Sequence, residues 1–261
     1  MAGSLLIGRI PVRYDDLALL HRVIAERREL TFPQLTAVLT PRWSYYLSNA
    51  ATLLKETLSF GVTLGLFECG SERAWDDRTF RTAFPAAGLR ATVLQLLTKQ
   101  GDLAQLAFRG VHDTLVDQGK VYTDVPEVVE VMESSAFGQA FRWNDTKVNF
   151  WSQFAHDLGL VIRMPPQRLA LSPTTALLRE LLPEECGPVR PMLEYWHREY
   201  CAVFTRLGDV HEGFARALLR LEAQGHLTLS YASDTVGSVV LCGRRVSHWS
   251  APQGDPDVDP V

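Results

Sequence analysis

The sequence predicts a mainly α-helical protein with small β hairpins, built from several short units in which a helix, a glycine and a strand follow one another. Three observations support this fold class. Apolar residues recur at the 3/4 spacing of helices in most segments, glycine ends several of these segments, and short runs of β-type residues come next. With 46% apolar and 21% charged residues among 261, the composition is that of an ordinary globular chain.

The clearest unit lies between Asp145 and Leu171. Its apolar residues share one helical face: Val148, Trp151, Phe154, Ala155 and Leu158. Asn144 or Asp145 can cap the start of this helix, and Gly159 can end it in the left-handed conformation. Two strands are predicted at 160–164 and 167–171, with a turn at Pro165-Pro166, where two backbone donors are missing.

The first part of the chain follows the same plan. Helices are predicted over residues 14–28, 33–39 and 44–60. Gly61 is expected to end the third helix, 62–68 to form a strand, and Gly70-Ser71 to turn the chain. We therefore predict a first module over residues 12–82.

The middle of the chain is less regular. Helices are predicted at 89–98 and 103–116, and the residues that follow Gly119 can begin a strand. Residues 83–123 are either a helical spacer or a degenerate module without a hairpin, and the spacer is favoured. A further helix at 125–132 and the unit from Asp145 make a second module, 124–172.

The last part of the chain is predicted to form a third module over residues 174–249. Its helices are expected at 175–182, 191–204 and 207–224, the last ending at Gly225. Strands at 226–231 and 236–242 flank a turn-forming run. Residues 250–261 contain three prolines and three aspartates, and we expect this tail to be disordered.

A helix closed by glycine and followed at once by a two-stranded hairpin resembles the recognition helix and wing of a winged helix-turn-helix module. Three such units suggest tandem winged-helix-like modules. The resemblance implies that the third helix enters the major groove of DNA while the wing meets the backbone. The side chains it places on DNA are Arg142, Asn144, Thr146, Lys147, Asn149, Gln153, Arg163 and Arg168 in the second module, and Arg42, Asn49 and Lys55 in the first.

Charge separates the third module from the others. The whole chain has a formal net charge of −4, and residues 173–261 account for all of it. The helix at 191–204 is rich in aromatic residues, which are frequent at protein interfaces. We therefore expect the third module to contact protein, either a second copy or another chain, through Met192, Tyr195 and Arg198.

Two other functions stay open beside binding of duplex DNA by an accessory subunit or regulator. Acidic tandem winged-helix proteins resemble the scaffold subunits that embrace the kleisin of condensin-type complexes, and the net charge suits that alternative. A repressor that senses a small molecule is a third possibility, although no pocket can be identified from the sequence.

An enzyme is not expected. The sequence contains no G-x-S-x-G, Walker, H-E-x-x-H or G-x-G-x-x-G motif. Its four cysteines, Cys69, Cys186, Cys201 and Cys242, lack ligand-like spacing, so neither a metal nor a cofactor is predicted. Free thiols and the lack of a long apolar run predict a cytoplasmic protein without a membrane span.

Overall fold

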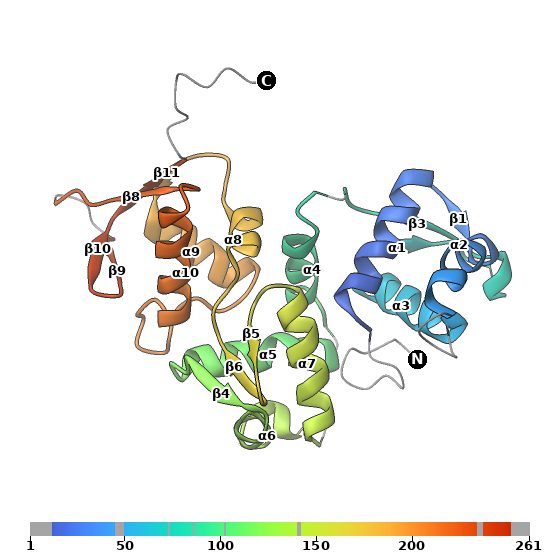
Figure 1. The fold of residues 1–261 in the computed structure, drawn as a ribbon, viewed down its shortest axis with the longest axis horizontal. Helices are drawn as coiled ribbons and strands as arrows, with labels where there is room; N and C mark the ends of the chain where they lie inside the picture. Colours follow the sequence, from blue (N-terminus) through green and yellow to red (C-terminus); the bar gives the residue numbers. More distant parts are fainter. Residues whose placement is uncertain are drawn as a thin grey trace.

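The computed structural model describes residues 12–44, 50–72, 74–85, 87–101, 103–139, 142–233 and 237–251. Within these ranges, helices contain several times as many residues as strands, and all the strands pair in small antiparallel sheets. The predicted mainly α fold class is confirmed. Figure 1 shows three lobes that meet around one short helix, α4 (Leu89–Thr98).

The first lobe, called here the first unit, spans residues 14–82. Its elements are α1 (Tyr14–Arg27), β1 (Leu30–Thr31), α2 (Phe32–Ser44), α3 (Ala50–Leu64), β2 (Phe67–Cys69), the short 3-10 helix η1 (Trp75–Asp77) and β3 (Thr79–Thr82). The sheet has the order β1-β3-β2, so the last strand lies between the other two.

Two predictions for this unit were wrong. Gly61 does not end α3, which continues to Leu64 and ends at Gly65, whose φ is +84°. Gly61 is needed inside the helix because the Phe67 ring packs on it: an added Cβ would lie 2.3 Å from a ring carbon. The predicted strand at 62–68 is therefore reduced to β2, and its partner β3 was not predicted.

The second unit spans residues 103–170. Its elements are α5 (Leu103–Asp117), β4 (Tyr122–Asp124), α6 (Val125–Glu133), the 3-10 helix η2 (Ala136–Gln139), α7 (Asp145–Asp157), β5 (Ile162–Met164) and β6 (Arg168–Ala170). Asn144 caps α7 by accepting from the amide of Lys147 at 3.0 Å, and Gly159 follows with φ +85°. The expected helix start, glycine and hairpin are confirmed.

Strand β4 crosses the boundary predicted between residues 123 and 124. It pairs with β6, so the sheet has the order β4-β6-β5, and α5 packs against α6. Helix α5 thus packs as the first helix of the second unit, and α4 alone lies between the units. The long separation between β4 and β6 in the sequence hid this pairing.

The third unit spans residues 175–250. Its elements are α8 (Thr175–Leu181), β7 (Gly187–Pro188), α9 (Val189–Glu199), α10 (Glu212–Ala223), β8 (Thr228–Ser230), β9 (Val239–Leu241), β10 (Arg244–Val246) and β11 (His248–Ser250). Strands β7, β11 and β8 form one sheet in that order, and β9 pairs only with β10 in the described part of the chain.

The predicted pairing of the strand at 226–231 with the strand at 236–242 was wrong. β8 pairs with β11, and β9 pairs with β10 across a two-residue turn, Cys242-Gly243. Both turn residues have positive φ, +49° and +86°, as the tightest hairpins require. Cysteine is an unusual residue for such a turn, so the local signal was missed.

Three further differences concern the ends of elements in the third unit. Helix α9 ends at Glu199 rather than 204, because the chain turns back and the Val203 amide donates to Nδ1 of His197 at 3.1 Å. Helix α10 begins at Glu212 rather than 207. Ser250 belongs to β11, while residues 252–261 of the predicted tail lie outside the described part of the chain.

The three units share one plan. Each runs helix, strand, helix, helix, strand, strand, and in each sheet the last strand lies between the other two. The third unit has the β9–β10 hairpin inserted between its last two strands, and the first and second units each contain a 3-10 helix, η1 or η2. This shared order places the third helix, α3, α7 or α10, beside the connection of the last two strands.

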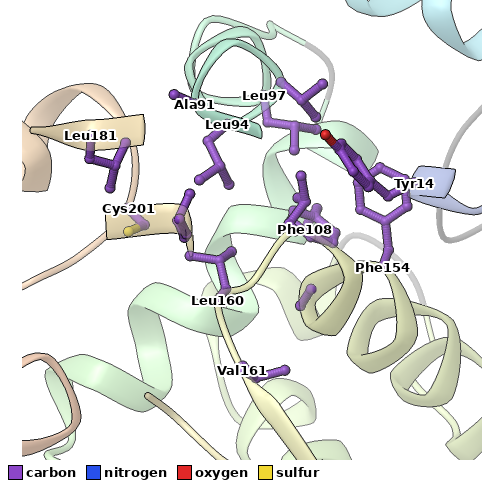
Figure 2. Packing of buried hydrophobic residues seen from close by; sticks show 14 of the residues in the cluster. Tyr14, Ala91, Leu94, Leu97, Phe108, Phe154, Leu160, Val161, Leu181 and Cys201 are labelled. Carbon is purple, nitrogen blue, oxygen red and sulfur yellow. The ribbon is translucent and has the colours of Figure 1, made fainter. Parts of the chain in front are cut away.

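Helix α4 joins the units at their centre. It packs against α3 of the first unit, α5 of the second and α8 and α9 of the third. Figure 2 shows Leu94 and Leu97 of α4 between Tyr14, Phe108 and Phe154 on one side and Leu181 and Cys201 on the other. The carboxylate of Glu180, on α8, accepts from the Arg90 amide at 3.0 Å and from the Arg90 guanidinium at 2.9 Å, so it caps α4 from the third unit. One continuous hydrophobic cluster contains buried side chains of all three units.

Among the helices of the described residues, none combines the length and the apolar character that crossing a membrane requires.

Candidate nucleic-acid interface

A concave surface lies between α7 and the β5–β6 hairpin of the second unit and encloses a pocket of about 290 Å³. It brings together three residues predicted from the sequence to contact DNA: Asn149 from α7 and Arg163 and Arg168 from the hairpin strands. The remaining polar wall comes from Ser152 and Gln167, which the sequence analysis did not single out. The fold thus joins helix and hairpin residues into one surface.

Gln153 positions one of the two arginines. Its carbonyl oxygen accepts from the Arg163 guanidinium, and its amide nitrogen donates to a carboxylate oxygen of Asp157 at 2.8 Å. Both ends of the Gln153 amide are therefore engaged within the protein. Gln153 was predicted to contact DNA, and in the structure its amide links Arg163 to Asp157.

Asn149 and Arg168 are two of the available polar groups of this surface. Neither side chain has a hydrogen bond or an ion pair within the described part of the structure. Asp124 is the cross-strand partner of Arg168, but its carboxylate caps α6 by accepting from the Glu127 amide at 3.0 Å. An amide and a guanidinium thus remain open to a ligand.

The start of α7 has a mixed role. Asn144 uses its side-chain oxygen as the helix cap, and the Lys147 ammonium donates to the backbone oxygen of Arg142. Both residues therefore shape the helix terminus. Arg142 and Thr146 have exposed side chains beside it. The cation of Lys147 still contributes positive charge at this end of the surface.

The buried face of α7 contacts the first unit as well as its own. The Phe154 ring meets Tyr14 of α1 and Phe60 of α3 edge-on, with centroid distances of 6.3 Å and 6.0 Å. It also meets Phe108 of α5 at 5.4 Å. Helix α7 is thereby held in one orientation by both units.

The last turn of α7 faces a group of carboxylates at the start of α1. Burial raises the pKa of Asp16 above its ordinary value, Arg13 opposes this effect, and the charges of Asp15 and Asp157 add to it. Negative charge at this end repels phosphate. Unlike the last turn, the start of α7 and the hairpin beside it carry the cationic residues Arg142, Lys147, Arg163 and Arg168.

The first unit holds Lys55 on α3, where its Nζ lies 5.0 Å from the centroid of Trp75. Asn49 and the side chain of Arg42 lie outside the described part of the structure. Trp75 and Arg78, which line a surface with Lys55, were missed by the sequence analysis. The sequence signal that could have located β3, the strand after Trp75 and Arg78, is the alternation of polar Thr79 and Arg81 with apolar Phe80, which is the buried residue of the three.

In the third unit, the start of α10 is covered by the second unit. His211 caps α10 by accepting from the Gly213 amide at 3.2 Å, and its Nε2 lies 3.0 Å from the Lys120 carbonyl oxygen. Burial lowers the pKa of His211, which keeps the ring neutral and able to accept. The first turn of α10 is therefore not available to DNA.

Four arginines of the third unit are neutralised by carboxylates. The pairs are Arg190–Glu194, Arg198–Glu199, Arg216–Glu212 and Arg244–Glu222. These pairs neutralise four of the eight arginines of the third unit, and the start of α10 is covered by the second unit.

The residues predicted for a protein interface lie beside an apolar groove of about 530 Å³ on the third unit. Tyr195 is 39% exposed and packs edge-on against Tyr200 at 5.8 Å. Arg198 lies over the Tyr195 ring at 5.6 Å. Met192 lines the groove but is only 5% exposed, so it belongs mainly to the core.

The cysteines and metal-type ligands show no arrangement for a metal in the described residues. No group of three or more His, Cys, Asp or Glu side chains there is placed to hold an ion. The four cysteines are free, and burial raises the pKa of the Cys201 thiol well above its ordinary value. Cys201 is therefore a protonated core residue.

No protein-family model, curated protein or solved structure matches this chain.

Proposed function

We propose that the three units are tandem winged-helix modules and that the protein binds duplex DNA without enzymatic activity, as an accessory subunit or regulator. The observation that carries the proposal is the concave surface of the second unit, where Arg163 and Arg168 stand beside Asn149 without a carboxylate partner in the described residues. The plan of the units, with a third helix next to a hairpin, supports the same assignment.

The side chains of this surface suit two kinds of contact with DNA, one to phosphates and one to a base edge. The guanidinium groups suit phosphate oxygens and hold the duplex in register, while the Asn149 amide suits an adenine edge. Because Gln153 and Asp157 orient Arg163, that cation is placed before DNA arrives. The acidic end of α7 limits contact to the start of the helix and the hairpin.

Replacing Arg168 by alanine is expected to weaken binding to all duplexes alike. Each lost phosphate contact lowers the slope of log affinity against log salt concentration by about 0.9. Replacing Asn149 by alanine is expected to reduce discrimination between sequences, by about 1–3 kcal/mol if it reads a base. Fluorescence anisotropy titrations of labelled duplexes at several salt concentrations measure both effects.

Arg220→Ala is the matched control, because Arg220 is an exposed cation of α10 that lies in the third unit. It is expected to bind like the unmodified protein. Failure of the unmodified protein to bind any duplex at about 50 mM salt, where phosphate contacts are strong, would refute the DNA proposal.

A second candidate function is that of a scaffold similar to the winged-helix partners of kleisin. The apolar groove beside Tyr195 and Tyr200 favours it. Glu185 lines the groove and Glu184 is exposed next to it, so this local negative charge disfavours pairing of the groove with the same surface of a second copy. The partner that fits is an apolar segment of a different protein, flanked by basic residues.

For this candidate, light scattering after size-exclusion chromatography is expected to show a monomer of 29.2 kDa at micromolar concentrations. A peptide with an apolar centre and basic flanks is expected to bind in calorimetric titrations, and Tyr195→Ser is expected to weaken it. The exposed Tyr231, which lies outside the groove, provides the control Tyr231→Ser. A stable dimer, or equal binding by both variants, argues against this candidate.

A further inference from the structure

The first unit has a concave surface at the place that corresponds to the one in the second unit. It has a volume of about 420 Å³ and lies between α3 and the connection from β2 to β3. The residues that matter for its chemistry are Lys55, Glu56, Ser59, Thr63, Trp75 and Arg78. In both units, therefore, the surface lies between the third helix and the connection of the last two strands.

Trp75 positions two cations at this surface. Lys55 Nζ lies 5.0 Å from the ring centroid, and Arg78 Cζ lies 4.9 Å from it. The ring itself is held by Phe80, stacked at 5.9 Å, and by Phe32, which meets it edge-on at 5.5 Å. The positive charges of Lys55 and Arg78 are thus both held next to the fixed indole ring of Trp75.

These cations differ from their neighbour in being free of carboxylates. Arg81 on β3 is paired with Glu29, its Nε donating at 2.9 Å. Neither Lys55 nor Arg78 has an ion pair in the part of the chain that the structure describes, and Arg78 donates from Nε to the backbone oxygen of Glu72 and interacts with the Cys69 side chain. Among the described residues that line the surface, the acidic one is Glu56, and it forms no ion pair with Lys55.

We propose that this surface of the first unit is a second phosphate-binding site for the duplex bound by the second unit, with Trp75 as the positioning residue. The inference rests on the proposed function. The Lys55 ammonium and the Arg78 guanidinium donate to phosphodiester oxygens, and the hydroxyl groups of Ser59 and Thr63 are further donors. Because Trp75 is packed by Phe80 and flanked by cations, it is not free to stack on a base, so the site is indifferent to sequence.

The two units are joined through α4 and a shared core, so a duplex that contacts both sites is held at two places by one protein molecule. Binding at one site raises the effective concentration of DNA at the other, so loss of either site lowers the affinity of the whole protein. This arrangement lets a chain with a net charge of −4 hold a polyanion through two local cationic surfaces.

The test uses the full chain and a labelled duplex, titrated at several salt concentrations. Lys55→Ala and Arg78→Ala are each expected to lower the log–log salt slope by about 0.9 and to weaken binding about eightfold near 0.1 M salt, equally for all sequences. Glu56→Gln is expected to tighten binding several-fold, because it removes the negative charge from the surface. A gain of affinity cannot arise from misfolding.

Trp75 is tested by its own pair of variants. Trp75→Leu is expected to lower the salt slope more than either single cation variant, because both cations lose their support, and Trp75→Phe is expected to restore most of it. Arg81→Ala is the matched control on the same unit, since its charge is already paired, and it is expected to leave binding unchanged. Circular dichroism confirms that each variant is folded.

Two failures can be told apart. If the unmodified protein binds no duplex, the proposed function and this inference both fall. If it binds and Arg168→Ala weakens binding while Lys55→Ala, Arg78→Ala and Glu56→Gln behave like the unmodified protein, only the second site is overturned.

Discussion

Replacing Gly213 by alanine is expected to destabilise the protein by roughly 3 kcal/mol, the upper end of the usual cost of overpacking. Gly213 lies in the first turn of α10, where an added Cβ would stand 1.7 Å from the backbone oxygen of Leu171 and 3.2 Å from a ring carbon of His211. A backbone atom cannot rotate away as a side chain can. The second and third units must therefore separate to accept the methyl group.

The expected loss of stability for Gly213→Ala is opposite in sign to the usual effect of this substitution in a helix. In an exposed helix, alanine in place of glycine stabilises by about 1 kcal/mol, so a large loss must come from the contact between units. Gly187→Ala is the control, because nothing lies within 4 Å of its added Cβ, and it is expected to change stability by less than about 0.5 kcal/mol. Thermal unfolding followed by circular dichroism measures both. Equal melting temperatures for the Gly213 and Gly187 variants would contradict the close contact of α10 with Leu171.

Replacing Trp151 by alanine is expected to destabilise the second unit by about 3–5 kcal/mol. Trp151 is fully buried on α7, and its indole nitrogen donates to the backbone oxygen of Phe108 on α5 at 3.0 Å. The variant loses a large buried apolar surface and the hydrogen bond from the indole to the Phe108 carbonyl. Since α7 forms one wall of the concave surface, duplex binding is expected to fall together with stability.

Trp151→Phe separates the two contributions. It keeps a ring but removes the indole donor, so a smaller loss of about 1 kcal/mol is expected from the lost hydrogen bond. Tyr231→Ala is the control, because this aromatic residue is largely exposed and its loss is expected to change little. Urea titrations compare the midpoints of unfolding at constant slope. A Trp151→Ala midpoint close to that of Tyr231→Ala would show that α7 is not anchored through this residue.

The sequence located elements best where local chemistry decides them. Asn144 caps α7 through a side-chain oxygen that accepts a nearby amide. Gly159 takes the left-handed conformation that ends α7, and the hairpin follows as expected. Each of these features depends on residues within a few positions of one another, so a single sequence contains the whole signal.

Features that depend on distant partners were missed. In the sequence, Gly61 resembles a helix end, and only the structure shows that it lies inside α3 with the Phe67 ring packed on it. The pairing of β8 with β11 cannot be predicted from the sequence of either strand alone. The boundary drawn at residue 124 divided β4 because its partner β6 lies more than forty residues later.

The candidate site shows the same division. Helical spacing was enough to place Asn149 on the polar face of α7, and the Pro-Pro turn was enough to place Arg163 and Arg168 on a hairpin. Only the tertiary structure shows that Gln153 orients Arg163, that carboxylates of α1 lie near the last turn of α7, and that Trp75 gathers Lys55 and Arg78. The physical reason is that caps and turns are decided by short-range hydrogen bonds and backbone sterics. Whether a charge stays free for a ligand depends instead on which distant groups the fold brings within a few ångströms of it.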